Sequence, residues 1–242
     1  MTIDTAIVLA GGLGTRLRSL VADVPKPMAP VGSKPFLSYL MNYWYSQGIR
    51  HFILSVGYMH QVIIDYYGSC FLDAKISYAV EQVPLGTGGG LLLASQQYKS
   101  NHSVLVLNGD TYFKVSLKAL ENFASQNQAE VLFSAFESNN TQRYMPLDVG
   151  LDGQLNFAIN RNIKTRSSPI WVNGGVYLIK PSLLQTLNFN QSEKFSLERD
   201  VFNMLYEKNI PIYAKLFHES FIDIGLPDDY LQFQQSQFKE TI

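Results

Sequence analysis

The chain has 242 residues, of which 46% are hydrophobic and 16% are charged, and its formal net charge at pH 7 is −1. A protein of this length folds as one α/β domain or as two small ones, with enough chain to bury a sizeable core. The near-neutral charge provides no basic field of the kind that attracts nucleic acid or a membrane surface, and we expect neither as a partner. A bound anion must therefore be held by local geometry.

The single cysteine, Cys70, cannot form an internal disulfide, which is typical of proteins in the reducing cytosol. Because no histidine or aspartate pattern accompanies it, we expect a buried and unreactive thiol. The first residues, MTID, lack the basic start of a secretory signal, and the apolar run TAIVLA is too short to span a membrane. The sequence therefore predicts a cytoplasmic protein.

Strands and helices alternate in the first half of the chain. Short apolar runs predict strands, and apolar residues at helical spacing that stop at glycine predict helices. The expected strands cover residues 5–10, 49–57, 75–80 and 103–107, and the expected helices cover 35–47, 61–67 and 89–98. This alternation predicts βαβ units and a mainly parallel sheet.

The second half of the chain is less regular. It predicts strands at 130–136, 154–158, 171–179 and 212–217, helices at 117–124 and 196–208, and a glutamine-rich terminal helix. No linker rich in proline, glycine or serine separates the halves, so we expect one domain over residues 1–242 with two lobes, 1–110 and 111–242. The predicted fold class is α/β, with a Rossmann-like, mainly parallel mixed sheet flanked by helices.

A glycine-rich loop, GGLGTR, follows the first predicted strand. Such a loop is a general anion site, because its N–H groups can face a phosphate and glycine removes the Cβ clash. It is not a Walker A loop, since no Lys-Ser or Lys-Thr pair begins a helix after it. It also matches the dinucleotide fingerprint poorly, since Leu17 stands where the third glycine belongs.

Two basic residues accompany this loop. Arg16 closely follows the glycines, and Lys26 lies between Pro25 and Pro27. Proline fixes φ on both sides of the lysine, which is therefore held on a stiff segment. A guanidinium fork and a compact ammonium charge suit a phosphate whose charge rises in a transition state. The alternative, a glycine turn whose basic side chains merely face solvent, is disfavoured by the PKP element.

The stretches IVLAGGLGTRL (7–17) and PKP (25–27) resemble the sugar-1-phosphate nucleotidyltransferases, also called nucleotide-sugar pyrophosphorylases. The resemblance continues in the same order along nearly the whole chain, through EQVPLGTG, LNGD, VNGGVY, FSLERD and FIDIG. It implies the GT-A-like architecture of these enzymes, with a nucleotide-binding lobe at 1–110 and a sugar-binding lobe at 111–242.

The resemblance also implies a reaction and a set of site residues. A nucleoside monophosphate passes from a nucleoside triphosphate to a sugar 1-phosphate by Mg²⁺-assisted in-line displacement, and pyrophosphate leaves. The implied catalytic residues are Arg16 and Lys26. The implied nucleotide-binding residues are Leu9, Ala10, Gly11, Gly12, Gly14, Thr15, Glu81, Gln82, Gly86, Thr87 and Gly88.

Two aspartates are the implied ligands of Mg²⁺. Asp110 ends a predicted strand, and ligands of open α/β sheets gather at the carboxyl ends of strands. Asp223 lies in FIDIG, between apolar residues that anchor it and a glycine that lets the backbone approach closely. Taken alone, either aspartate is better explained as a turn cap, so these roles rest on the resemblance. Asp200 and Glu198 are weaker candidates, since acidic residues also favour a helix start.

The base and the sugar are expected to contact two further segments. Glu81 and Gln82 precede the glycine run, and a carboxylate accepts two N–H bonds of the kind that the N1 and N2 edge of guanine offers. The Leu-Gly-Thr form resembles the guanylyltransferases of the family, so GTP is the predicted nucleotide, while uridylyl- and thymidylyltransferases stay open. The implied sugar-binding residues, for a heptose or hexose 1-phosphate, are Asn173, Gly174 and Glu198.

Two observations leave alternatives open. A bulge beside a packed Tyr177 explains Asn173 and Gly174 equally well. Family members commonly carry an F-x-E-K segment whose acid contacts the sugar, whereas residues 157–161 are FAINR. The missing acid favours an unusual sugar, or a nucleotide- or sugar-phosphate-binding regulatory module that lacks turnover. A homodimer also stays open. The abundant aromatic side chains fit an exposed dimer face, and they fit a well-packed core equally well.

Overall fold

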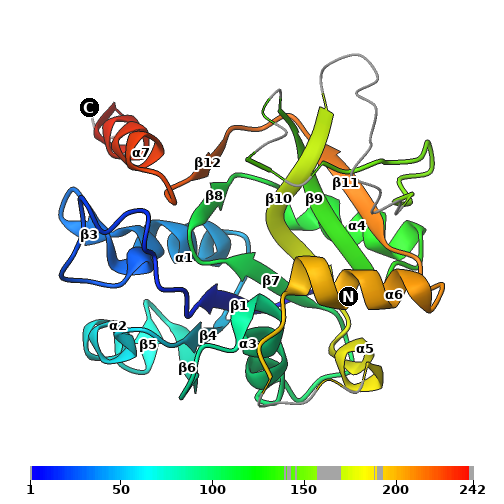
Figure 1. Cartoon of the computed structure of the whole chain (residues 1–242), viewed down its shortest axis with the longest axis horizontal. Helices are drawn as coiled ribbons and strands as arrows, with labels where there is room; N and C mark the ends of the chain where they lie inside the picture. Colours follow the sequence, from blue (N-terminus) through cyan, green and yellow to red (C-terminus); the bar gives the residue numbers. More distant parts are fainter. Residues whose placement is uncertain are drawn as a thin grey trace.

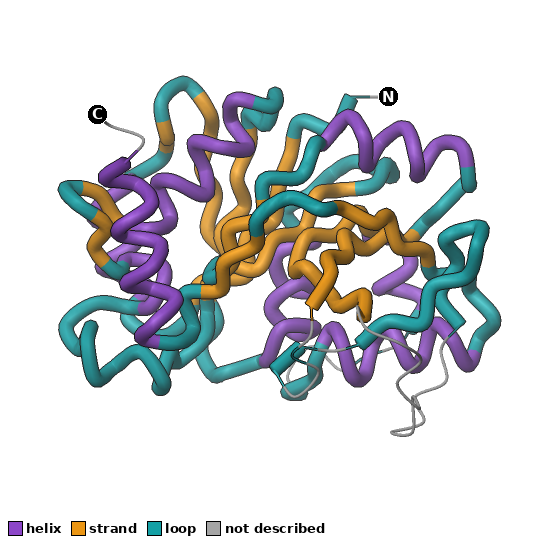
Figure 2. Tube along the Cα trace, turned by 90° about the horizontal axis from the view of Figure 1, so that it is seen from above, coloured by secondary structure: helices purple, strands orange, loops and turns teal. Residues whose placement is uncertain are grey.

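The structure, a computed structural model, describes residues 2–138, 140, 143–144, 146–156, 170–187, 189 and 193–239 (Figure 1). Within these residues a sheet of eight strands forms the centre, in the order β11-β9-β10-β7-β1-β4-β6-β5, and seen from above it is one continuous layer (Figure 2). The strands are β1 (Thr5–Ala10), β4 (His51–Val56), β5 (Cys70–Phe71), β6 (Ala74–Val80), β7 (Val104–Asn108), β9 (Val131–Ser138), β10 (Ile170–Ile179) and β11 (Tyr213–Phe217).

The sheet is mixed but mainly parallel, as predicted. β1 pairs in parallel with β4 and β7, β4 pairs with β6, and β9 pairs with β11, whereas β10 runs antiparallel to both β7 and β9. β4 lies on one side of β1, and the later strand β7 lies on the other. The direction in which strands are added therefore reverses between β1 and β7. Open α/β sheets bind ligands at such a reversal, outside the carboxyl ends of the strands.

Helices cover both faces of the sheet (Figure 1). They are α1 (Phe36–Ser46), α2 (His60–Tyr67), α3 (Gly86–Ser95), α4 (Leu117–Gln126), α5 (Pro181–Thr186), α6 (Phe202–Glu207) and α7 (Pro227–Lys239). Ala6 and Val8 of β1 share a core with residues of α1, α2, α4 and α7, whereas Ile7 shares a core with residues of α3, α5 and α6. A strand buried on both faces needs an unbroken apolar run, which explains the sequence TAIVLA. Among the described helices, none has the length and apolar character needed to cross a membrane.

The predicted elements are largely present, with shifted ends. α3 begins at Gly86, not at residue 89, because the glycine run itself forms the first helical turn. The helix expected at 196–208 is a π-helical turn, Leu197–Val201, followed by α6. Of the strand expected at 154–158, Gln154 and Leu155 form isolated bridges, and its last two residues lie outside the described residues. The whole FAINR stretch, residues 157–161, also lies outside them. The short strands β2 (Pro30–Val31), β3 (Lys34–Pro35), β5, β8 (Thr111–Phe113) and β12 (Phe221–Asp223) were not predicted.

Two of these short strands join distant parts of the chain. β8 pairs antiparallel with β12, with Asp223 opposite Thr111. The Ile224 N–H extends the contact by donating to the carbonyl O of Asp110 at 2.9 Å. The Phe221 ring, in β12, stacks on a ring of β9 with 3.9 Å between the ring centroids. This ladder brings Asp110 and Asp223 next to each other, although they are far apart in the sequence.

The prediction of a buried thiol was wrong, because Cys70 is exposed. Cys70 begins β5, a two-residue strand at the edge of the sheet whose neighbour in the described sheet is β6 alone. An edge strand of this length has no second neighbour to cover its side chains. The apolar sequence around Cys70 does not reveal this position at the edge.

Gly109 marks a close approach between the end of β7 and β1. A Cβ atom at this position would lie 2.7 Å from the carbonyl O of Leu9 and 3.2 Å from the Cα of Ala10, both of them backbone atoms of a central strand. We expect Gly109→Ala to lower the free energy of unfolding by about 1–3 kcal/mol, the usual effect of overpacking, as measured by urea denaturation. Gly12→Ala is the control, because a Cβ atom there would meet nothing within 4 Å. Equal losses in the two variants would contradict the explanation.

Candidate functional site

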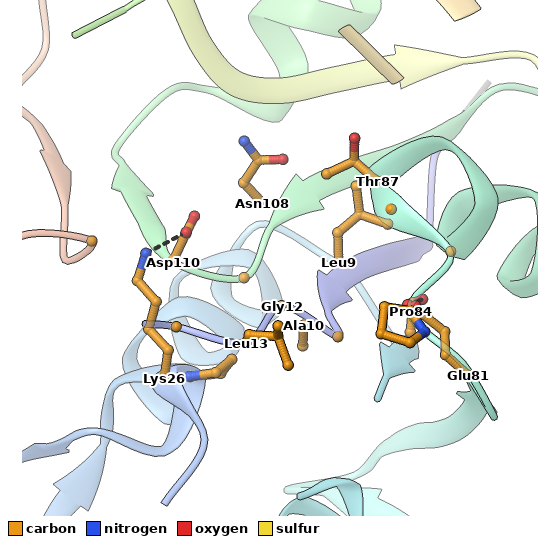
Figure 3. A pocket seen from close by; sticks show the side chains of 18 of the residues that line it. Leu9, Ala10, Gly12, Leu13, Lys26, Glu81, Pro84, Thr87, Asn108 and Asp110 are labelled. Atoms are coloured by element: carbon orange, nitrogen blue, oxygen red, sulfur yellow. Dashed lines mark hydrogen bonds and ion pairs between the residues drawn. The ribbon is translucent and has the colours of Figure 1, made fainter. Parts of the chain in front are cut away.

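A cavity of about 430 Å³ opens at the carboxyl ends of β1, β6 and β7, where the strand order reverses. The predicted catalytic pair, Arg16 and Lys26, and the predicted metal ligand Asp110 all line it. The predicted nucleotide-binding residues in its wall are Leu9, Ala10, Gly11, Gly12, Gly14, Thr15, Glu81, Gly86 and Thr87. Figure 3 shows Lys26 and Asp110 on one side of the cavity and Glu81 with Pro84 on the other, so its two ends differ chemically.

The glycine loop and the PKP element meet at this cavity. Gly14 has a φ of +59°, and a Cβ atom there would lie only 2.8 Å from the Cβ of Lys26. Pro25 is extended and leads into a short 3-10 helix, Lys26–Met28, in which the Met28 N–H donates to the Pro25 carbonyl O at 2.7 Å. Glycine is therefore needed at position 14 for its backbone conformation and for the approach of Lys26. The two sequence motifs therefore pack directly against each other.

The ammonium group of Lys26 lies between two carboxylates. Its Nζ donates to Asp110 Oδ2 at 2.5 Å and lies 3.7 Å from Asp223 Oδ1, and the lysine side chain is only 10% exposed. A Cβ atom at Gly225 would lie 2.8 Å from Lys26 Nζ and 3.3 Å from a terminal nitrogen of Arg16. The structure thus brings both predicted basic residues and both predicted metal ligands to one end of the cavity.

The carboxylates of Asp110 and Asp223 would suit a magnesium ion that also binds a phosphate of the substrate. Asp110 and Asp223 each turn one oxygen toward the same point, which the Lys26 ammonium marks. Among the described residues, no cluster of three or more His, Cys, Asp or Glu side chains could hold a metal by itself. Mg²⁺ usually keeps several waters and takes one or two carboxylates together with substrate phosphates, and it does not require a cage made only of protein ligands. Two convergent carboxylates therefore match this ion.

Glu81 lies at the opposite end of the cavity from Lys26 (Figure 3). Its Oε2 accepts from the Leu85 N–H at 2.9 Å, and its Oε1 accepts a longer bond from the Ser55 hydroxyl at 3.2 Å. Burial raises the pKa of the Glu81 carboxyl above its usual value, and the two hydrogen bonds only partly oppose this shift. Cβ atoms at Gly11 and Gly90 would lie 2.4 Å and 2.8 Å from Glu81 Oε1, so the glycines on both sides make room for the carboxylate.

A hydrogen-bond network connects Thr87 in the cavity wall to β10, the strand that carries the predicted sugar-binding residues Asn173 and Gly174. Thr87 donates to Glu198 Oε2 at 2.9 Å, and the Tyr177 hydroxyl donates to Glu198 Oε1 at 3.3 Å. Asn173 donates from its amide nitrogen to the Tyr177 hydroxyl at 2.9 Å and accepts from the Gly175 N–H at 3.0 Å. Tyr177 is fully buried beside an irregularity in the pairing of β10 with β9, so the bulge with a packed aromatic, which was the alternative explanation of Asn173 and Gly174, is present.

The remaining predicted residues lie outside the cavity wall. Gln82 is exposed, and Gly88 is a packing position, where a Cβ atom would lie 2.4 Å from the Phe195 ring. Gly174 is likewise buried, with its missing Cβ 2.6 Å from the Phe113 ring. Asp200 Oδ2 accepts from the Ser196 N–H at 2.6 Å, and the Ser196 hydroxyl in turn accepts from the Arg199 N–H at 3.3 Å. Asp200 therefore takes part in capping the helix start, together with the N-cap residue Ser196.

Some wall residues were not predicted. Asn108 is one of them, and its Oδ1 is buried without a hydrogen-bond partner. Asn108 directly precedes Gly109 and Asp110 in the LNGD motif, so its place in this motif could have identified it as a site residue from the sequence. Lys194, by contrast, lines the cavity without belonging to any of the motifs.

A family model described as nucleotidyl transferase matches residues 5–240. This chain belongs to the nucleotidyl transferase family. The predicted resemblance, the α/β architecture and the enzyme class are confirmed by this match together with similar proteins of known name and structure.

Three of these similar proteins cover nearly the whole of this nucleotidyl transferase. The D-glycero-alpha-D-manno-heptose 1-phosphate guanylyltransferase of Campylobacter jejuni is 38% identical over 228 residues, which are 94% of this chain and 97% of that one. The protein of the same name from Aneurinibacillus thermoaerophilus is 36% identical, over 95% and 96% of the two chains. The crystal structure of HddC from Yersinia pseudotuberculosis complexed with GMP-PN is 32% identical over 97% and 99% of the two chains, with a TM-score of 0.79.

The raised pKa of Glu81 predicts a pH-dependent stability difference between the free protein and the Glu81→Gln variant. Above the ordinary pKa of glutamate, about 4.3, the unfolded chain loses its proton while the folded chain retains it, so ionisation favours unfolding. We expect the Tm of the wild type minus that of the variant to be highest below this pH. As the pH rises, this difference in Tm should then fall until the pH exceeds the raised pKa of Glu81 in the folded protein. Thermal unfolding from about pH 4 to pH 8 measures this, with the exposed Glu207→Gln as control. A pH-independent difference would contradict the burial argument.

Proposed function

We propose that this nucleotidyl transferase moves GMP from GTP to a heptose 1-phosphate, or to a hexose 1-phosphate, forming a GDP-sugar and pyrophosphate. The observation that carries the proposal is the convergence of Lys26 with Asp110 and Asp223 at one end of a cavity that has a half-buried glutamate, Glu81, at the other. The two heptose 1-phosphate guanylyltransferases, at 36% and 38% identity over almost the full length of both chains, support the choice of base and sugar.

The nucleophile of this reaction is already an anion. A phosphate oxygen of the sugar 1-phosphate attacks the α-phosphorus of GTP, and the bond from that phosphorus to the bridging oxygen breaks. Pyrophosphate leaves with the electron pair. No strong general base is needed, so catalysis consists of positioning two polyanions and balancing their charge.

Lys26 and Arg16 are the proposed sources of positive charge. The Lys26 side chain is only 10% exposed, so water screens the interaction of its ammonium group with a phosphate weakly. The glycine loop beside it lets phosphate oxygens approach the backbone closely. Arg16, which is exposed in the cavity wall, offers a planar fork to a second pair of phosphate oxygens.

Asp110 and Asp223 are the proposed holders of Mg²⁺. When bound, the ion would neutralise phosphate oxygens and stabilise the charge that develops on them. The 36% exposure of Asp110 leaves its carboxylate accessible from the cavity, while Asp223, at 16%, is more enclosed. Asp110 is thus the more accessible of the two carboxylates.

The other assignments follow from the same proposal. Glu81, in the nucleotide-binding lobe at 1–110, accepts N–H bonds from guanine. Asn173, Gly174 and Glu198, in the sugar-binding lobe at 111–242, contact the sugar. The polar ends of Asn173 and Glu198 already have partners within the protein, so either residue would contact the sugar with its remaining hydrogen-bonding capacity. A cytoplasmic location fits the nucleotide substrate, and homodimerisation stays a prediction.

The rival function is a nucleotide-binding regulatory module without turnover. Such a module has no need for the ion cluster of Lys26, Asp110 and Asp223, because binding alone does not require charge balance at the reacting phosphorus. The presence of all three side chains in contact distance favours the enzyme.

Pyrophosphate release tests the proposed function directly. The purified protein is assayed with Mg²⁺, with GTP, UTP or dTTP, and with a panel of heptose and hexose 1-phosphates. We expect release with GTP and D-glycero-α-D-manno-heptose 1-phosphate to exceed every other pair. Asp110→Asn, checked for an unchanged fold by circular dichroism, is expected to show no Mg²⁺-dependent release. Absence of release with every pair would favour the regulatory module, and a preference for UTP or dTTP would overturn the choice of base.

Removal of the Lys26 ammonium group should slow the reaction without changing its substrates. We expect Lys26→Ala to lower kcat/KM by about 10²–10³-fold, the usual loss when one electrostatic contact to a transition state is removed. Arg18→Ala is the control, because Arg18 is a nearby exposed cation that lies over the Tyr58 ring, 4.6 Å from its centroid, and outside the cavity wall. Near-normal turnover in the Lys26 variant, or an equal loss in the Arg18 variant, would remove Lys26 from this role.

A further inference from the structure

A second cation, Arg143, contacts Asp223 from outside the cavity. Arg143 lies in the loop after β9, and its Nη2 donates to the carboxylate of Asp229 and, at 3.2 Å, to the backbone carbonyl O of Asp223. The same nitrogen lies 3.5 Å from Asp223 Oδ2. The side chains of Arg143 and Asp229 are 18% and 23% exposed, so water reaches these contacts poorly. Neither residue lines the cavity.

The two oxygens of the Asp223 carboxylate have different partners. Oδ1 accepts from the Gly225 N–H at 2.7 Å and lies 3.7 Å from Lys26 Nζ, whereas Oδ2 faces Arg143. Because Arg143 also binds the backbone carbonyl of Asp223, it restrains the residue at its main chain and at its side chain. Rotation of the carboxylate would break one contact or the other. Oδ1 is therefore held toward the end of the cavity where Lys26 and Asp110 lie.

Asp229 determines the charge of this arrangement. An arginine without a partner would repel any cation that Asp223 holds, because the two positive charges would lie only a few ångströms apart. Asp229, in the first turn of α7, pairs with Arg143 and neutralises it. Because the pair of Arg143 and Asp229 carries no net charge, its main effect is to orient the carboxylate of Asp223.

Aromatic packing keeps Arg143 in place. Its guanidinium carbon lies over the Tyr144 ring, 4.9 Å from the ring centroid. The Tyr144 ring contacts the rings of Phe136 and Phe221, at centroid distances of 5.3 Å and 5.5 Å. Phe136 belongs to β9 and Phe221 to β12, so the arginine is supported by the main sheet and by the strand that carries Asp223.

We propose that Arg143, held by Asp229, is a positioning residue that aims Asp223 Oδ1 at the cation and phosphate end of the cavity. The inference deepens the proposed function and rests on it, since it assigns a role in cation binding to a pair of residues outside the cavity. Residues behind a metal ligand that orient it usually affect metal affinity or activity by about 10–100-fold.

The test measures cation binding and not turnover. Mn²⁺, which is detected by electron paramagnetic resonance, is titrated into the full chain with a GTP analogue that cannot release pyrophosphate. We expect Arg143→Met to raise the Kd of Mn²⁺ by about 10–100-fold. Arg143→Lys should give a smaller increase, because it keeps the charge and loses the fork. Asp229→Asn should also raise the Kd, and its combination with Arg143→Met should add no further increase, because Asp229 acts through Arg143.

The control is Lys180→Met. Lys180 pairs with Glu130 at 2.6 Å, at the ends of β9 and β10 that lie away from Asp223. We expect this variant to bind Mn²⁺ as the wild type does, and Tm values show which variants remain folded. If Arg143→Met does not fold, Arg143→Lys and Asp229→Asn decide the question.

The outcomes separate this inference from the proposed function. Wild-type affinity in folded Arg143 variants, an equal loss in Lys180→Met, or full additivity of the Arg143 and Asp229 variants would each overturn the positioning role. If the wild type binds Mn²⁺ with the analogue no better than Asp110→Asn does, the assignment of the cation to Asp110 and Asp223 falls, and the inference falls with it, whereas the transfer reaction is still decided by pyrophosphate release. If the wild type binds well and the Arg143 variants match it, only the inference falls.

Discussion

The ionic contact of Lys26 with Asp110 and Asp223 is the interaction on which the rest of the site depends. Two carboxylates that converge in a half-buried place repel each other, and a cation between them offsets most of this repulsion. The lysine is fixed by two prolines and by its contact with Gly14, so it can hold this position without losing much side-chain entropy on binding a phosphate. The same ammonium group thus offsets the charge of the two carboxylates in the protein without substrate. It also lies where, in our proposal, the phosphates of GTP are bound.

Topology decides where this contact can form. The reversal of strand order between β1 and β7 leaves a crevice at their carboxyl ends, which the glycine loop and Asp110 both enter. The ladder of β8 and β12 then delivers Asp223 from the last part of the chain to the side of Asp110. The aromatic rings of Phe221 and Phe136 hold that ladder against the main sheet. The three-residue strand β12 is thus held by its pairing with β8 and by this aromatic packing.

Local motifs made part of this arrangement predictable. The mainly parallel sheet follows from rules that act over a few residues and was confirmed. The glycine loop and the PKP segment were recognised in the same way, and they meet at the cavity, while their binding of phosphate stays a prediction. The proximity of Asp110 and Asp223 was expected only through a resemblance, because no local rule reports a contact between such distant segments. β8 and β12 are too short for a periodic pattern, and Arg143 and Asp229 stand in no motif. Cys70 shows the same limit, since its exposure depends on the edge position of β5 and not on its apolar neighbours.

The choice between bases can be argued from the other end of the cavity. Burial makes an ionised Glu81 unfavourable unless it receives strong donors, and its protein partners, Leu85 and Ser55, supply only two hydrogen bonds. Guanine presents N1–H and N2–H side by side, a pair of donors that matches a carboxylate. Uracil and thymine present one N–H between two carbonyl oxygens, which a carboxylate would repel. A polar group that is buried and left without its partners discriminates more strongly than an apolar wall, so one glutamate is sufficient, in our proposal, to favour GTP.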